Sequence, residues 1–131
     1  VYESVRVGDP REAGILVGPL IDKAAYEGMD RALGDALAHG GSVHGGVRVH
    51  ADAWPDAYYV APALVEMPSQ TGPMLHETFA PILYVTRYAR FEDAVAMNNV
   101  VGAGLSSSLF TMNLREAEAF TCAAGSDCGI A

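Results

Sequence analysis

Glu77 and Phe79 are the residues whose types and spacing most directly suggest chemistry. They lie two positions apart, so in an extended segment their side chains would point to the same side, where one ligand could meet both. A carboxylate accepts hydrogen bonds on two oxygens, and an aromatic ring packs against a flat ring system. The pair therefore suggests a site for a sugar and a planar heterocycle together. A solvated glutamate beside a core phenylalanine would show the same spacing, so both interpretations stay open.

The segments after this pair alternate between strand and helix patterns. The predicted elements are, in chain order, a strand at 81–88, a helix at 91–99, a strand at 106–111, a helix at 113–124 and a strand from 126 onward. Asn113 with Glu116 predicts a capping-box-like helix start, and Gly125 stands where a C-terminal glycine cap is expected. Strands joined through single helices run parallel, with right-handed crossovers. We therefore predict an α/β fold with a mostly parallel sheet and flanking helices.

The first half carries one strong helix pattern. Asp22 is a good N-cap, and the pattern stops at His39, where the following glycines can provide a left-handed cap. The apolar positions between them are Ala25, Met29, Leu33, Ala36 and Leu37. This spacing predicts an amphipathic helix.

Shorter patterns flank this helix. Turn signals predict an irregular loop over 9–19, and polar residues predict another over 51–56. Residues 42–44 and 47–49 are predicted to be short strands around a tight turn at two glycines. Residues 58–65 form a β-rich run that Pro62 interrupts, which places the proline at an edge or a bend.

Composition limits the class of protein. The chain has 131 residues, half of them hydrophobic, which is enough for one globular domain with a core. Its net charge of −8 repels phosphate backbones and anionic membranes, so we expect neither nucleic acid nor membrane as a partner. No apolar run approaches the length of a membrane span. Cys122 and Cys128 could pair, but one bridge is not a disulfide framework, and a cytoplasmic protein is expected.

Other candidate sites have simpler explanations. Cys122 and Cys128 are expected to be buried structural thiols, the first on the apolar side of a helix and the second in a strand. Residues 102–104 begin like a dinucleotide fingerprint but precede a strand, which predicts a loop. The histidines have neither the spacing nor the cysteine partners of a zinc site, so we predict no metal. They are His39, His44, His50 and His76.

Three stretches together resemble one known family. They are Glu77-Thr78-Phe79-Ala80-Pro81-Ile82-Leu83-Tyr84-Val85, then Asn98-Asn99 ahead of Gly104-Leu105-Ser106-Ser107-Ser108, and finally Gly125-Ser126-Asp127-Cys128-Gly129-Ile130. The chain resembles, over essentially its whole length, the catalytic domain of NAD(P)-dependent aldehyde dehydrogenases. Within that superfamily it is similar to the antiquitin branch, the α-aminoadipic semialdehyde (piperideine-6-carboxylate) dehydrogenases.

The resemblance implies roles for the first two residues. Glu77 would bind the hydroxyls of the nicotinamide ribose, and Phe79 would pack beside the nicotinamide ring of NAD or NADP. The whole enzyme would oxidise an aldehyde, such as α-aminoadipic semialdehyde from lysine catabolism, to a carboxylate through a cysteine thioester. Family members form homodimers or homotetramers.

The resemblance also implies that residues 1–131 are only part of the catalytic domain. In the family, the catalytic cysteine, the general-base glutamate and the dinucleotide-binding domain lie upstream of the matching segment. We therefore expect no catalytic residue in this chain and no activity from it alone. Two alternatives stay open: a non-catalytic stand-alone fold or interaction module, and another branch, such as a succinic-semialdehyde or betaine aldehyde dehydrogenase.

Overall fold

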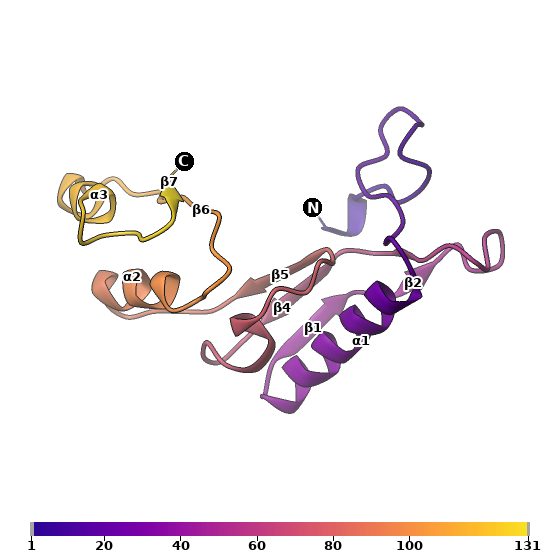
Figure 1. The fold of residues 1–131 in the computed structure, drawn as a ribbon, viewed down its shortest axis with the longest axis horizontal. Coiled ribbons are helices and arrows are strands. Elements are labelled where there is room, and N and C mark those ends of the chain that lie inside the picture. Colours follow the sequence, from indigo (N-terminus) through magenta and orange to yellow (C-terminus); the bar gives the residue numbers. More distant parts are fainter. Residues whose placement is uncertain (1, 131) are drawn as a thin grey trace. The chain divides into compact units, whose positions relative to one another are not determined.

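The computed structural model describes residues 2–130, which form two compact units, Val1–Thr86 and Arg87–Ala131. Both units combine helices with strands, and each contains a parallel strand pair. The predicted α/β class is confirmed. Figure 1 shows the order of the elements along the chain.

The first unit is built on a three-stranded sheet of order β1-β4-β5. Its elements are η1 (Tyr2–Ser4), α1 (Lys23–Ala38), β1 (Ser42–Gly45), β2 (Arg48–Val49), β3 (Tyr59–Val60), β4 (Ala63–Glu66), η2 (Gly72–Leu75) and β5 (Ile82–Val85). The central strand β4 runs antiparallel to β1 and parallel to β5, with Val65 opposite both Val43 and Tyr84. Strands β2 and β3 form a separate antiparallel pair.

Helix α1 matches its prediction closely. The Asp22 carboxylate accepts a hydrogen bond from the backbone N–H of Ala25 at 2.8 Å, which satisfies one of the free donors of the first turn. After the C-cap at His39, Gly40 has a φ of +81°, the left-handed conformation that favours glycine. Leu37, which the pattern placed on the apolar face, is exposed.

The core of this unit lies between α1 and the sheet. Its buried members are Met29, Leu33, Ala36, Val60, Ala63, Val65 and Met67. Three of the five apolar positions that predicted the helix are among them. All seven side chains are apolar, so hydrophobic burial is the main force that holds this unit together.

The glycine turn after β1 does not join paired strands. Strands β1 and β2 exist as predicted, but β1 pairs with β4 and β2 pairs with β3. Gly45 and Gly46 have φ values of +84° and +78°, and a Cβ on Gly45 would lie 2.2 Å from the Pro62 carbonyl oxygen. At these two glycines, the first of which passes close to Pro62, the backbone leads from β1 in the three-stranded sheet to β2 in the two-stranded sheet. Pro62 separates β3 from β4 in the same way, so it marks a bend and not an edge.

The second unit contains α2 (Phe91–Asn99), β6 (Ser106–Ser107), α3 (Leu114–Thr121) and β7 (Gly129–Ile130). Strands β6 and β7 run parallel and are joined through α3, as predicted. The strands are shorter than their patterns suggested, and the final residue of the last predicted strand, 131, lies outside the described residues.

In the first unit, β5 pairs in parallel with β4. The connection between these two strands contains η2 and no α-helix. The sequence pattern did not predict this pairing.

The N-terminal and C-terminal caps of α3 differ from the predicted caps. Asn113 is the N-cap and accepts from Arg115 N–H at 3.0 Å, but Glu116 accepts from the Thr111 hydroxyl at 2.6 Å and does not complete a capping box. Gly125 lies beyond the C-cap without a positive φ. Its role is spatial, since a Cβ there would lie 2.2 Å from the Phe120 carbonyl oxygen.

Candidate functional site

The predicted site lies on the loop at 76–81, between η2 and β5. The loop is held at both ends. His76 N–H donates to the Pro73 carbonyl at 3.2 Å, and the Pro81 carbonyl accepts from Ala63 N–H of β4 at 2.9 Å. Ala80 packs against the hydrophobic core. The loop is therefore clamped to the sheet and to the 3-10 turn on either side of the two candidate residues.

Phe79 has an unusual backbone conformation. Its φ of +52° is left-handed, and among the described residues only one other non-glycine residue, His50, has a positive φ. A bulky residue in this conformation carries strain of about 1–3 kcal/mol, which the surrounding structure must offset. The extended geometry assumed from the spacing is therefore wrong. The ring is 79% exposed, so the alternative interpretation as a core phenylalanine is also wrong.

Glu77 lies on the same loop and is also exposed. Among residues 2–130 its carboxylate has no hydrogen-bond or ion-pair partner, so both oxygens are available as acceptors. Two vicinal hydroxyls of a sugar could donate to those oxygens, in charge-assisted bonds that orient the sugar. An exposed aromatic ring two residues away offers a packing surface for a planar heterocycle. The residues present therefore fit a ligand that contains both groups.

An apolar hollow of about 400 Å³ adjoins this loop. It is lined by Tyr2, Val5, Leu16, Val17, Pro62, Ala80, Pro81, Ile82 and Leu83. Ala80 and Pro81 belong to both the hollow and the loop, so the loop forms one wall of it. Neither Glu77 nor Phe79 is among the lining residues.

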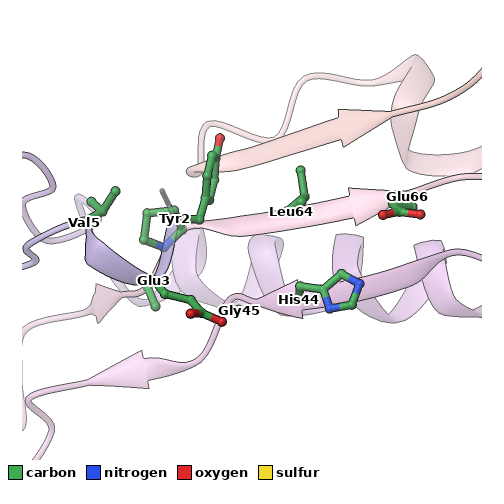
Figure 2. Close-up of a pocket in the computed structure, with 9 residues that line it drawn as sticks. Tyr2, Glu3, Val5, His44, Gly45, Leu64 and Glu66 are labelled. Carbon is green, nitrogen blue, oxygen red and sulfur yellow. The ribbon is translucent and has the colours of Figure 1, made fainter.

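A larger hollow of about 750 Å³ lies elsewhere in the same unit. Figure 2 shows residues that line it: Leu64 and Glu66 on β4, His44 on β1, and Tyr2 and Glu3 of η1. The carboxylates of Glu3 and Glu66 and the imidazole of His44 lie at its wall. Neither Glu77 nor Phe79 lines this hollow, so it is not the site that the sequence indicated.

The second unit contains a polar network that the sequence analysis did not predict. Asn99 Nδ2 donates to the Gly125 carbonyl at 2.8 Å, and its Oδ1 accepts from Asp127 N–H at 3.2 Å and from Asn98 Nδ2 at 2.8 Å. Asn98 Nδ2 also donates to Ser126 Oγ at 3.1 Å. The stretches containing these residues stood out separately in the sequence, but no local signal showed that they contact each other.

Cys128 lies at the edge of this network. Its sulfur is 3.4 Å from Ser126 Oγ, which is 2.5 Å from the oxygen of the buried Ser107. Hydrogen bonding by the Ser107 and Ser126 hydroxyls lowers the pKa of the Cys128 thiol below its ordinary value. Cys128 is half-buried and lies one residue before β7, so the prediction of a buried thiol within a strand is wrong.

Cys122 differs from its prediction. It is exposed, it follows α3 as the C-cap, and its thiol donates to the Ala119 carbonyl at 3.3 Å. The prediction of a buried thiol on the apolar side of the helix is wrong, because the helix ends one residue earlier. Both cysteines are free.

The other candidates from the sequence, the histidines and residues 102–104, form no binding site among the described residues. Within residues 2–130 no three His, Cys, Asp or Glu side chains are grouped so as to hold a metal ion, and all four histidines are exposed. In the same range no helix is long and apolar enough to span a bilayer. Residues 102–104 lie in a loop that contains a turn at 102–103, so the loop prediction is confirmed.

Comparison with known proteins agrees with the motifs. The model of the aldehyde dehydrogenase family matches residues 1–130. Aldehyde dehydrogenase family 7 member A1 of Malus domestica is 38% identical over 130 residues, which are 99% of this chain and 25% of that protein. Alpha-aminoadipic semialdehyde dehydrogenase of Mus musculus is 41% identical over 130 residues, 98% of this chain and 24% of the mouse protein.

Solved structures show the same similarity. PnpE from Pseudomonas sp. WBC-3 matches with a TM-score of 0.85 and 31% identity, over 98% of this chain and 27% of PnpE. PnpE in complex with nicotinamide adenine dinucleotide matches equally well, with a TM-score of 0.85. The chain thus spans about a quarter of the length of the curated relatives that it matches.

Proposed function

The chain belongs to the aldehyde dehydrogenase family, and from this we propose that it forms the cofactor-positioning part of an enzyme that oxidises an aldehyde to a carboxylate with NAD or NADP. The observation that carries the proposal is the clamped loop at 76–81. It exposes an unpaired carboxylate, Glu77, and an aromatic ring held out by a strained backbone, Phe79. The PnpE complex with nicotinamide adenine dinucleotide supports the type of cofactor.

Glu77 and Phe79 have separate tasks in this proposal. The Glu77 carboxylate accepts hydrogen bonds from two hydroxyls of the nicotinamide ribose and so limits the rotation of the sugar. The Phe79 ring packs beside the nicotinamide, excludes water and restricts where the ring can lie. The nicotinamide cofactor supplies the hydride acceptor for the oxidation. The loop orients the cofactor, and the hydrogen bonds at its two ends keep the loop rigid.

The remaining parts of the reaction are assigned to other regions of a longer polypeptide. A cysteine outside this chain would attack the aldehyde, hydride transfer would leave a thioester, and water activated by a glutamate would release the carboxylate. Because this chain covers about a quarter of its relatives, we propose that it is part of the catalytic domain and is inactive alone.

The substrate and assembly are proposed from the relatives. The mouse relative carries the name alpha-aminoadipic semialdehyde dehydrogenase, which supports a semialdehyde with amino and carboxylate groups as the substrate, in lysine catabolism. We propose a homodimer or homotetramer for the full-length protein. A cytoplasmic location suits the two free thiols.

Substitution of Glu77 tests this function. In a full-length polypeptide carrying this segment, Glu77→Gln should weaken NAD binding by about 10-fold or more, because charge-assisted hydrogen bonds to the ribose are lost. Binding is measured by titration, and oxidation of α-aminoadipic semialdehyde by NADH absorbance. Glu66→Gln, an exposed glutamate on β4, is the matched control and should leave both unchanged.

Two results would contradict the proposal. Unchanged cofactor binding in the Glu77→Gln variant would remove the role assigned to the loop. Turnover by the 131-residue chain alone would mean that Cys122 or Cys128 acts as a nucleophile, which the proposed division of the site does not allow.

A further inference from the structure

Gly72 begins the 3-10 turn η2, which leads into the candidate loop at 76–81. Its φ of +57° lies in the left-handed region that favours glycine. The ring of His39, the C-cap of α1, lies against this glycine. A Cβ on Gly72 would lie 2.9 Å from His39 Nδ1, 3.0 Å from Cε1 and 3.1 Å from Cγ. Position 72 therefore has no room for a side chain while the His39 ring stays in place.

Two contacts hold the His39 ring in that place. Its Nδ1–H donates to the Asp35 carbonyl oxygen at 2.8 Å, and the same nitrogen lies 3.2 Å from the carboxylate oxygen Oδ1 of Asp35. Both acceptors belong to the last turn of α1, so the ring is fixed to the helix. Rotation about the Cβ–Cγ bond would not make room at position 72, because Cγ is itself one of the three close atoms. Turning the whole ring away would break both contacts with Asp35.

The turn η2 connects this contact to the start of the candidate loop. Pro73 is buried, and Met74 packs against the hydrophobic core. The Pro73 carbonyl accepts from the backbone N–H of His76, the first residue of the loop, at 3.2 Å. A displacement of η2 would therefore move His76 and, beside it, Glu77. The far end of the loop is anchored separately, by a backbone hydrogen bond to β4.

We propose that Gly72 and His39 are positioning residues, because the contact between them fixes the position of η2 and thereby the position of Glu77 toward the cofactor. This inference rests on the proposed function of the loop. In this arrangement both residues act through the start of the loop and neither touches the cofactor. Phe79 lies nearer the end that is anchored to β4, so it should depend less on the contact.

The main test is Gly72→Ala in a full-length polypeptide carrying this segment. The added methyl group meets the fixed His39 ring, so η2 must shift, and the Kd for NAD should rise about 5- to 10-fold in a titration. The KM for NAD should rise with it, while kcat at saturating NAD changes by less than about twofold. Amide hydrogen exchange should accelerate more at His76 and Glu77 than at Phe79. A merely structural loss would lower the amount of active enzyme, and hence kcat, without changing NAD affinity.

Gly40→Ala is the matched control for backbone strain. Gly40 follows His39 and also has a left-handed φ, +81°, but a Cβ there would lie 3.6 Å from Pro68 Cγ, an ordinary van der Waals distance. This variant should destabilise the fold, as a side chain at positive φ does, and leave the Kd for NAD within about twofold. An equal rise of the Kd in Gly40→Ala and Gly72→Ala would overturn the inference, because left-handed strain alone would then explain both.

A double-mutant cycle assigns the effect to the His39 ring. His39→Ala removes one support of η2 without adding strain, so exchange at residues 76–77 should accelerate and the Kd for NAD should rise about two- to threefold. In the double variant the methyl group at position 72 no longer meets the ring, so its Kd should lie below that of Gly72→Ala. Unchanged exchange in His39→Ala would contradict the inference, and so would a double variant whose Kd equals the product of the two single effects.

Glu77→Gln separates this inference from the proposed function. If Gly72→Ala leaves the Kd and the exchange unchanged while Glu77→Gln weakens NAD binding, the contact does not position the loop and the cofactor role stands. If Glu77→Gln has no effect on NAD binding, the cofactor role is wrong. The exchange at residues 76–77 then still decides whether the contact of His39 with Gly72 positions the loop.

Discussion

The two units of the chain are stabilised by different kinds of interaction. The unit at 1–86 has a contiguous core of buried apolar side chains, which joins α1 to the sheet. Among residues 87–129 the buried positions are Ser107, Phe120 and Gly125, and a network of asparagine and serine side chains joins the segments of this unit. Several large apolar side chains are exposed there. They are Leu105, Phe110, Met112 and Leu114.

This difference predicts which substitutions will destabilise each unit. Hydrophobic burial is spread over many contacts, so the first unit depends on the volume of its core residues. The second unit depends on a few directional hydrogen bonds, each of which can be lost with one atom. It also leaves several large apolar side chains exposed, whereas the apolar side chains of the first unit's core are buried.

The largest effect is expected from truncation of the core. Met29 is 1% exposed, so Met29→Ala should lower the free energy of unfolding by about 2–5 kcal/mol through lost burial and a cavity. Chemical denaturation followed by circular dichroism measures the change. Phe110→Ala is the control in the other unit. Its ring is 97% exposed, and a change within about 0.5 kcal/mol is expected. Equal losses in both variants would contradict the contrast between the units.

A smaller and more local effect is expected from Asn99→Ala. This change removes bonds to Gly125, Asp127 and Asn98, and should destabilise the second unit by about 1–3 kcal/mol. Amide hydrogen exchange should rise in α3 and stay unchanged in α1. Asp127→Ala keeps the backbone N–H that bonds Asn99, so it should have little effect. Faster exchange in α1 would show that the network is not confined to its own unit.

The smallest effect concerns the thiol at the edge of that network. Because serine hydroxyls lower the pKa of Cys128, Ser126→Ala should raise that pKa and reduce the thiolate fraction near neutral pH. Alkylation of Cys128 by iodoacetamide, followed by mass spectrometry across a pH series, should then shift to higher pH. Cys122 in the same digest serves as the internal reference. An unchanged profile would mean that the serine does not stabilise the thiolate.

Prediction from sequence succeeded where the signal was local. The Asp22 cap and the apolar spacing of α1 identified that helix, because a helix is formed by contacts within a few residues. The Gly125 cap failed, since its glycine is needed for close approach to Phe120 and not for a left-handed turn. For the site, the sequence identified the Glu77 and Phe79 pair but assigned it an extended geometry. Their role as cofactor ligands stays a prediction.

The sequence by itself determined the family, the α/β class and the helices, because motifs and periodicity are properties of short segments. Only the tertiary structure decided which strands pair, since β4 joins β1 and β5 from distant parts of the chain. It also decided the left-handed conformation of Phe79 and the hydrogen bonds that join Asn99 to Gly125 and Asp127. Each of these depends on packing between residues far apart in sequence, where no local preference specifies the partner.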